Sequence, residues 1–505
     1  MRYLTLMVAS AVASFLHAQE PREDLLSFAN GDQLHGKLSG IATGPSVLWK
    51  RDDVGEEVVF KSSELRRIVL RGGRPEKSIE GFSHVGTSNG DRIPGVVREM
   101  DDKRVVLDTT FGGIIEIPRD QVGLIAPNPL GGRILYHGPY DPEEWVMIDN
   151  EHLEGIPALK VDGETKMSVW KHSGSAWYWQ NKESGTALVK KAGLPDRAIL
   201  RFDITWKSRL SCAIAFHSNF KQAPQAAAKE GEEEIRAQER VVMAGGMNNP
   251  AALPDIFGDS YVLQLFSNYV MLHHTSFDAD GRPRLERVQT TNTNSSMRLG
   301  DSGTATVEIR CNRPTGEISL FIDGAFVVQW IEVEGGGDEG VGYAGKGEGF
   351  GFLVQTPESP VRISEIVVAE WNGMPDAARS LQVDDADIVL LSNGTDRFSG
   401  KVTGLSQSKL KLEGRYGDFE IPLNEIAEVH FAKSRIAKTS DAPSDEIRAR
   451  LHPLGRISGL PLAGDAGNLR ILNGAAGEIN MNLDYAVMLE FQKTESFLDD
   501  WDAEF

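Results

Sequence analysis

The chain has 505 residues, with 53 Lys plus Arg against 73 Asp plus Glu, so its formal net charge is −20. A hydrophobic fraction of 40% and a charged fraction of 25% are typical of globular proteins, which excludes a largely disordered chain. Nucleic acids and anionic membranes attract clustered positive charge, so an acidic chain of this kind predicts neither as a partner. The length predicts three or four domains.

The N-terminal segment predicts export. Arg2 precedes an apolar run over 4–16, and Ala18 supplies a small residue at the expected cleavage point. These features indicate a signal peptide over 1–18 and a mature protein in the periplasm or outside the cell. The run is shorter than the roughly 20 apolar residues that cross a bilayer, and no later segment is long enough, so we expect no membrane span.

The next elements are repeats, which occur at both ends of the chain. Three copies contain an Asn-Gly turn, at Asn30, Asn89 and Asn393, followed by an Asp, further strand-like runs and an alternating apolar strand. A weaker copy begins at Pro453. Asn-Gly favours tight hairpin turns, and a Gly within a strand marks a bend. Each copy therefore predicts a small, strongly bent β-barrel.

The copies define domains before and after the central part of the chain: 19–74, 75–138, 374–435 and 436–505. Their pattern of turns and alternating strands resembles the SH3-like and Sm-like small barrels. They carry neither a basic cluster nor an aromatic platform, so the RNA binding that an Sm-like barrel implies is not expected.

The central segment, 139–373, has a different texture, with about eleven strand-like runs separated by turn residues and an insertion at 221–258. Such a pattern is typical of a β-sandwich. The runs Ala198–Trp206, Thr306–Arg310 and Val361–Ala369, with the Asp323-Gly324 hairpin, resemble the concanavalin A-like, or laminin-G-like, jelly roll. They are also similar to the 3-keto-disaccharide hydrolase family. The predicted fold is therefore all-β, a jelly-roll sandwich with small β-barrel repeats on both sides.

Aromatic residues provide the strongest functional signal. Trp170, Trp177 and Trp179 cluster near the start of the central segment, and His217 follows on a later strand-like run. Aromatic faces pack against the apolar face of sugars, so we predict these four residues as carbohydrate-binding. The alternative is that the Trp side chains pack the sandwich core. Strand alternation places Tyr178 on the face opposite to Trp177 and Trp179.

Metal and cofactor signals are weak. His273 and His274 are adjacent, so on a strand they point to opposite faces, and no partner cluster has zinc spacing. Asp278, Asp280 and Gly281 match half of a calcium loop, although a hairpin turn accounts for them better. We expect no metal site and no cofactor, with calcium as the one open alternative.

Catalytic signals are also weak, so no catalytic residue is predicted and the sequence favours a non-enzyme. Glycosidases on this jelly roll often carry Glu-x-Asp-x-x-Glu on one strand, and this spacing does not occur. The hydrolase resemblance leaves an alternative, with Asp203, Glu308 and Asp323 as candidate acids and His217 as a base. A third reading is a structural protein whose repeats mediate assembly.

Cys212 and Cys311 are the only cysteines, and both lie in strand-like runs. An exported protein permits a disulfide between them, and two buried free thiols are the alternative. The leading hypothesis is an exported, non-catalytic protein that binds a glycan or cell-envelope polymer, or serves as a scaffold. The sequence does not determine the oligomeric state.

Overall fold

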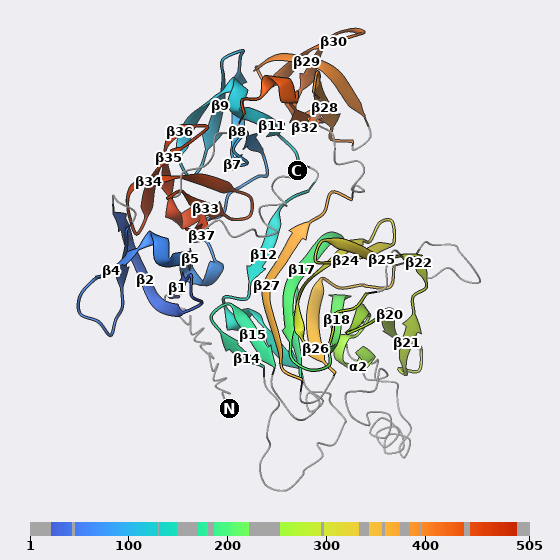
Figure 1. Ribbon diagram of the computed structural model, residues 1–505. Helices are drawn as coiled ribbons and strands as arrows, with labels where there is room; N and C mark the ends of the chain where they lie inside the picture. The colour runs from blue at the N-terminus through green and yellow to red at the C-terminus, as the bar shows by residue number, and fades with distance from the viewer. Residues whose placement is uncertain are drawn as a thin grey trace, which may run out of the picture.

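The computed structural model describes residues 22–42, 46–129, 131–148, 170–179, 186–221, 253–293, 297–332, 343–355, 359–373, 384–393, 396–438 and 445–491. Within these ranges the chain is almost entirely β-strand, with short 3-10 turns and one α-helix, α2 (Leu253–Phe257). The predicted signal peptide and most of the 221–258 insertion lie outside them. No helix in the described ranges is long and apolar enough to cross a membrane. The predicted all-β class is confirmed: small barrels precede and follow a jelly-roll sandwich in the chain and lie together on one side of it (Figure 1).

The barrels form four similar units of antiparallel strands. In each, the first strand pairs with the second and the last, and the following strands pair in sequence; in unit 2 the second strand is divided into β7 and β8, which do not pair with each other. Unit 1 comprises β1 (Asp24–Phe28), β2 (Gln33–Ala42), β3 (Ser46–Lys50), β4 (Val58–Lys61) and β5 (Leu65–Val69). Unit 2 comprises β6 (His84–Thr87), β7 (Arg92–Pro94), β8 (Val96–Met100), β9 (Arg104–Thr109), β10 (Gly113–Pro118) and β11 (Val122–Ala126).

The two units after the sandwich repeat this order. Unit 3 comprises β28 (Asp387–Leu391), β29 (Arg397–Ser406), β30 (Lys409–Gly414), β31 (Gly417–Pro422) and β32 (Ile426–His430). Unit 4 comprises β33 (Ile447–Leu451), β34 (Arg456–Asp465), β35 (Asn468–Asn473), β36 (Gly477–Asn482) and β37 (Ala486–Glu490).

The Asn-Gly turns act as the sequence indicates. The Asn30 carboxamide oxygen accepts a hydrogen bond from the Asp32 amide at 3.0 Å, and Asn89 does the same for Asp91 at 3.3 Å. Gly31, between the first pair, has φ of +93°, which Gly adopts without strain. These local turns set the register between the first two strands of a unit.

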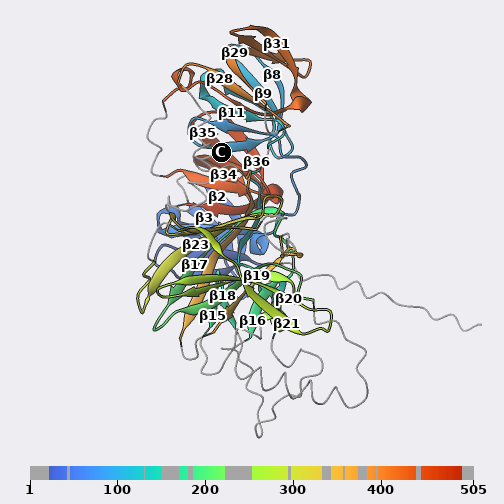
Figure 2. The same ribbon diagram turned by 90° about the vertical axis from the view of Figure 1, so that its right-hand side faces the viewer.

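The units pair in a nested order that the repeats alone do not predict. The last strand of unit 1, β5, pairs with β37 of unit 4, and β11 of unit 2 pairs with β32 of unit 3. The long second strands add contacts within the same pairs, between β2 and β34 and between β8 and β29. The first unit therefore meets the last, and the second meets the third. The sandwich is inserted between units 2 and 3 in the sequence and lies beside the row of units (Figures 1 and 2).

A buried carboxylate joins the two pairs. Asp91 of unit 2 is 2% exposed and accepts hydrogen bonds from the Ser458 amide at 3.0 Å and the Asn473 side chain at 2.6 Å, both in unit 4. Burial raises the pKa of the Asp91 carboxyl. The spatial order of the units is therefore 1, 4, 2, 3, and they share one continuous hydrophobic core.

The sandwich consists of two antiparallel sheets. The nine-stranded sheet contains β12 (Ile134–Gly138), β14 (Lys171–Ser173), β15 (Ala176–Trp179), β17 (Arg197–Trp206), β22 (Thr290–Thr293), β23 (Gly303–Asn312), β24 (Glu317–Ile322), β25 (Ala325–Ile331) and β27 (Val361–Glu370). The seven-stranded sheet contains β13 (Val146–Ile148), β16 (Ala187–Lys190), β18 (Ser211–Ser218), β19 (Ser260–Phe266), β20 (Val270–Phe277), β21 (Pro283–Arg287) and β26 (Gly349–Val354).

The two cysteines are free thiols in the core between these sheets. Cys212 lies on β18 of one sheet and Cys311 on β23 of the other, and both side chains are fully buried. Burial raises the pKa of each thiol to about 12. Of the two alternatives that the sequence left open, the disulfide is therefore not formed.

Candidate functional site

The predicted sugar-binding aromatics lie in the core of the sandwich. Trp170, Trp177 and Trp179 are 2%, 3% and 1% exposed, and they belong to the hydrophobic cluster between the sheets. The Trp170 indole donates a hydrogen bond to the Thr186 carbonyl at 2.8 Å. No indole face is left open to a sugar, so the prediction that these three residues stack on a ligand is corrected. Core packing, the alternative, is what the structure contains.

His217 is also a core residue. Its side chain is fully buried, and its ring nitrogens lie 2.6 Å from the Tyr343 hydroxyl and 2.9 Å from the Pro195 carbonyl. Burial lowers the pKa of the imidazole to about 4. The ring is therefore neutral, occupied on both sides and closed to solvent, which corrects its predicted roles as a sugar contact and as a base.

Tyr178 is the aromatic residue of this segment that reaches the surface. Its flanking Trp residues point into the core, so strand alternation turns Tyr178 to the outer face of the nine-stranded sheet, where it is 40% exposed. The signal for this was present in the alternation of Trp177, Tyr178 and Trp179.

Tyr178 belongs to a cross-strand row of side chains that we call the Tyr178 row. The register of β14, β15, β27, β17 and β23 aligns the five members of the row: Lys171, Tyr178, Arg362, Thr205 and Thr304. Lys171, Arg362 and Thr304 are exposed, and Thr205 is half-buried. The row therefore presents one aromatic ring, two cations and two hydroxyls on an open face.

Short distances tie the row together. The Arg362 guanidinium carbon lies 5.9 Å from the centre of the Tyr178 ring, and the Thr205 and Thr304 hydroxyls lie 3.0 Å apart. Rings flanked in this way combine an apolar face with hydrogen-bond donors and acceptors. The arrangement suits a ligand with an apolar ring face and several hydroxyl groups.

The predicted acids of the hydrolase alternative lie beside this row. Asp203 lies on β17, two residues before Thr205, and accepts a hydrogen bond from the Thr306 hydroxyl at 2.7 Å. Burial raises the pKa of the Asp203 carboxyl. Glu308 lies on the adjacent strand, 2.6 Å from the Arg310 guanidinium. Asp323 accepts from the Thr306 amide at 2.8 Å in a hairpin turn.

The opposite outer face, on the seven-stranded sheet, is partly covered. Residues of α2 (Leu253, Ile256 and Phe257) form one buried cluster with Ala215 and Val262 of that face. Elsewhere on this face, the Gln264 side-chain amide donates a hydrogen bond to the Gln355 side-chain oxygen at 3.1 Å. The Gln264 oxygen and the His273 Nδ1 are buried and have no hydrogen-bond partner within the described part of the chain. Because α2 fills part of it, this face is a weaker candidate than the Tyr178 row.

The calcium alternative is not supported by the local geometry. The Asp278 carboxylate accepts hydrogen bonds from the amides of Asp280 and Arg282 at 3.0 and 2.8 Å, which closes the hairpin turn between β20 and β21. His274 pairs with Glu286 at 2.9 Å. Over the ranges that the structure describes, no group of three or more His, Cys, Asp or Glu side chains is placed to hold a metal ion.

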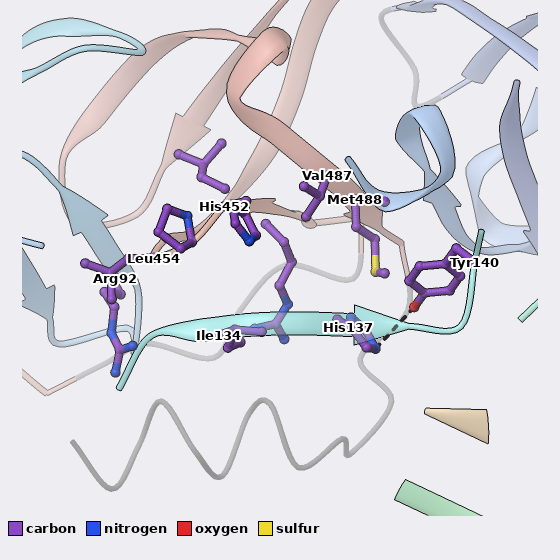
Figure 3. A pocket seen from close by; sticks show the side chains of 13 residues that line it. Arg92, Ile134, His137, Tyr140, His452, Leu454, Val487 and Met488 are labelled. Atoms are coloured by element: carbon purple, nitrogen blue, oxygen red, sulfur yellow. Dashed lines mark hydrogen bonds between the residues drawn. The ribbon is translucent and has the colours of Figure 1, made fainter. Parts of the chain in front are cut away.

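A cavity lies at the junction of unit 4 with β12 and is lined in part by Arg92, His137, Tyr140 and His452 (Figure 3). Its internal volume is about 40 Å³, which holds about three water molecules rather than a sugar ring. At one end the Tyr140 hydroxyl lies 3.1 Å from the His137 imidazole. We therefore regard the cavity as part of the junction between barrels and sandwich.

That junction is held by charge. Arg67 of unit 1 makes two hydrogen bonds to Glu365 of β27, at 2.6 and 3.1 Å, and the His137 imidazole lies 3.4 Å from the same carboxylate. Burial by itself raises the pKa of Glu365, but the charge of Arg67 and these hydrogen bonds hold the pKa well below its usual range. Glu365 has φ of +49° at a bulge in β27, which turns it out of the regular alternation.

Comparisons with known proteins add little beyond this geometry. No family model and no curated protein matches the sequence. Among solved structures, a carbohydrate-binding module from Bacillus subtilis is 10% identical, covering 45% of this chain and 96% of its own, with a TM-score of 0.24. A galectin-like protein of unknown function from the same organism is 12% identical, covering 48% and 98%, with a TM-score of 0.25.

A third solved structure is a non-specific endo-β-1,3(4)-glucanase, 10% identical over 55% of this chain and 97% of its own, with a TM-score of 0.26. At such TM-scores these likenesses carry no information on ligand or activity. The jelly-roll description stands on the strand pairings within the chain itself. The similarity of the four units to SH3-like or Sm-like barrels stays a prediction.

Proposed function

We propose that this protein is an exported, non-catalytic carbohydrate-binding protein, with the Tyr178 row as its binding surface and the four barrel units as its scaffold. The exposed Tyr178 ring carries the proposal, since it provides an apolar face for a sugar ring among groups that hydrogen-bond hydroxyls. Export rests on the apolar run at 4–16.

The scaffold role is supported by how the barrels meet the sandwich. Unit 1 contacts the nine-stranded sheet at Glu365, through Arg67, and at Ser175, whose hydroxyl lies 3.2 Å from the Gln33 amide. These contacts leave Tyr178 and Arg362 exposed on the same face. The barrels thus fix the orientation of the surface without covering it.

The test compares two exposed tyrosines in the full mature chain. Tyr416, 89% exposed in unit 3, has the Arg415 guanidinium carbon 5.7 Å from its ring and is a matched control for Tyr178. We expect Tyr178→Ala to weaken retention on immobilised polysaccharides tenfold or more, since truncation of a central aromatic anchor commonly has such an effect. Tyr416→Ala should bind as the wild type does. Equal binding by all three proteins would refute the proposed surface.

A second candidate, hydrolysis, is favoured by one observation. The register places Asp203 and Glu308 as diagonal neighbours on β17 and β23, and such neighbours lie about 7–8 Å apart. A carboxyl of raised pKa at such a distance from a second carboxyl is the pairing that inverting glycosidases use. Cleavage of an oligosaccharide by the wild type and not by Asp203→Asn would establish it. Intact oligosaccharides after prolonged incubation would exclude it.

A further inference from the structure

We infer that the ligand of the Tyr178 row is a polysaccharide that carries separate acidic groups, carboxylates or sulfates, on its sugar rings. This inference rests on the proposed function and specifies its substrate class. The observation behind it is that two exposed cations, Lys171 and Arg362, flank the Tyr178 ring and have no ion pair within the described part of the chain.

On the barrel units, some exposed strand cations pair with a carboxylate on the neighbouring strand, whereas others, such as Lys401 and Lys411 of unit 3, have no ion pair within the described residues. In unit 2, Arg98 lies 2.6 Å from Asp108, and Arg104 lies 2.8 Å from Glu116. The pairs Arg470–Glu478 in unit 4, at 3.2 Å, and Lys409–Glu420 in unit 3, at 3.6 Å, follow the same diagonal pattern. A chain with a net charge of −20 has abundant carboxylates for such pairing.

The two cations of the Tyr178 row are among the unpaired ones. Across the part of the chain that the structure describes, neither Lys171 nor Arg362 has a carboxylate within ion-pair distance. Asp203 interacts electrostatically with Arg362, but its carboxylate accepts a hydrogen bond from the Thr306 hydroxyl, and burial raises the pKa of its carboxyl. Both cations are exposed, so each can bind an external anion.

The positions of the groups fit an acidic sugar. Lys171 and Arg362 lie opposite Tyr178 on the strands at either side, and adjacent strands are about 4.8 Å apart. A sugar ring above Tyr178 therefore has a cation within reach of either edge. A guanidinium binds a carboxylate or sulfate through two parallel hydrogen bonds, which favours Arg362 as the main anion contact.

The net charge of the chain narrows the class of ligand further. A charge of −20 repels a dense polyanion such as a nucleic acid, and this row offers only two cations against it. A glycan with one acidic group per sugar or fewer can contact both cations and the aromatic ring, and the acidic chain repels it less than it repels a nucleic acid. We therefore assign the row to a glycan rather than to a nucleic acid.

The test uses paired polymers that differ only in charge. Polygalacturonate, alginate and a sulfated galactan are compared with their carboxyl-reduced or desulfated forms, with the full mature chain as the binder. We expect the wild type to bind at least one acidic form tenfold or more tightly than its neutral counterpart, and to lose this preference in high salt. Arg362→Gln should abolish the preference, whereas the matched control Arg415→Gln should keep it.

The outcomes separate this inference from the proposed function. Equal binding of acidic and neutral forms, lost in Tyr178→Ala, would overturn the acidic ligand and leave carbohydrate binding intact. No binding to any polymer would overturn both. Tighter binding of single-stranded DNA than of any acidic glycan, lost in Arg362→Gln, would show that the row binds nucleic acid and would also overturn the inference.

Discussion

Two residues of β27, three positions apart, show opposite uses of charge. Glu365, near the middle of the strand, lies against Arg67 of unit 1 and His137 of β12, so these charged groups are partnered. Arg362, near the start of the strand, is exposed beside Tyr178 and has no ion pair within the described ranges. Partnered, enclosed charges hold the domains together, whereas an unpartnered, exposed cation remains free to bind another molecule. The same strand thus carries a structural contact and a candidate binding surface.

The largest effect on stability is expected at Glu365. Glu365→Gln keeps the shape of the side chain but leaves the buried Arg67 without its counter-charge, which costs about 3 kcal/mol. We expect the apparent Tm of the full chain to fall by about 3 °C.

The control for this change is an exposed pair of the same type. Glu478→Gln removes the partner of Arg470, whose side chain is 53% exposed, and should cost less than about 1 kcal/mol. Equal shifts of the Tm in the two variants would contradict the structural role assigned to the Glu365 contact.

A pH-dependent effect is expected from the neutral, enclosed His217. Burial lowers its pKa to about 4, so the unfolded chain takes up a proton below about pH 6.5 while the folded protein does not. The stability that the neutral ring contributes is complete above pH 6.5 and is lost as the pH falls toward 4. The loss is on the order of 3 kcal/mol.

Denaturation midpoints at pH 7 and pH 4.5 test this expectation. His217→Asn, in which Asn tolerates the positive φ at this position, should be less stable at pH 7 but should lose less on acidification than the wild type. His35→Asn changes an exposed imidazole and should leave the pH dependence unaltered. An unchanged pH slope in His217→Asn would mean that the ring does not titrate as described.

A smaller effect is expected where the unit pairs join. Asp91→Ala removes the acceptor of the Ser458 amide and the Asn473 side chain, which costs about 2 kcal/mol. Asp396 holds the same position in the turn of unit 3 but is exposed, so Asp396→Ala should cost less than about 0.5 kcal/mol. Urea denaturation of the two variants compares the positions, and similar midpoints would contradict the nested arrangement.

The smallest effect on stability is expected in the Tyr178 row. Arg362→Gln and Tyr178→Ala change exposed side chains without ion pairs, so each should alter the free energy of unfolding by about 0.5 kcal/mol or less. The same denaturation series measures this. A loss comparable with that of Glu365→Gln would show that the Tyr178 row is structural, which would remove the contrast between Glu365 and Arg362.

Local patterns account for what the sequence predicts correctly. The Asn30 and Asn89 turns and the alternation of apolar residues depend on neighbours in the chain, so they indicate strands, turns and an all-β fold. The pairing of β5 with β37 depends on groups more than 400 residues apart and has no local signal. The prediction of Trp177 and Trp179 as sugar contacts was wrong because it rested on residue type, whereas burial depends on which sheet face points inward.

The most direct test of glycan binding by the Tyr178 row is a crystal structure of the full mature chain with an acidic oligosaccharide chosen from the polymer comparison. We expect a sugar ring over Tyr178, with its acidic group bound by Arg362. A ligand bound instead near Gln264 and His273, on the outer face of the seven-stranded sheet, would contradict it.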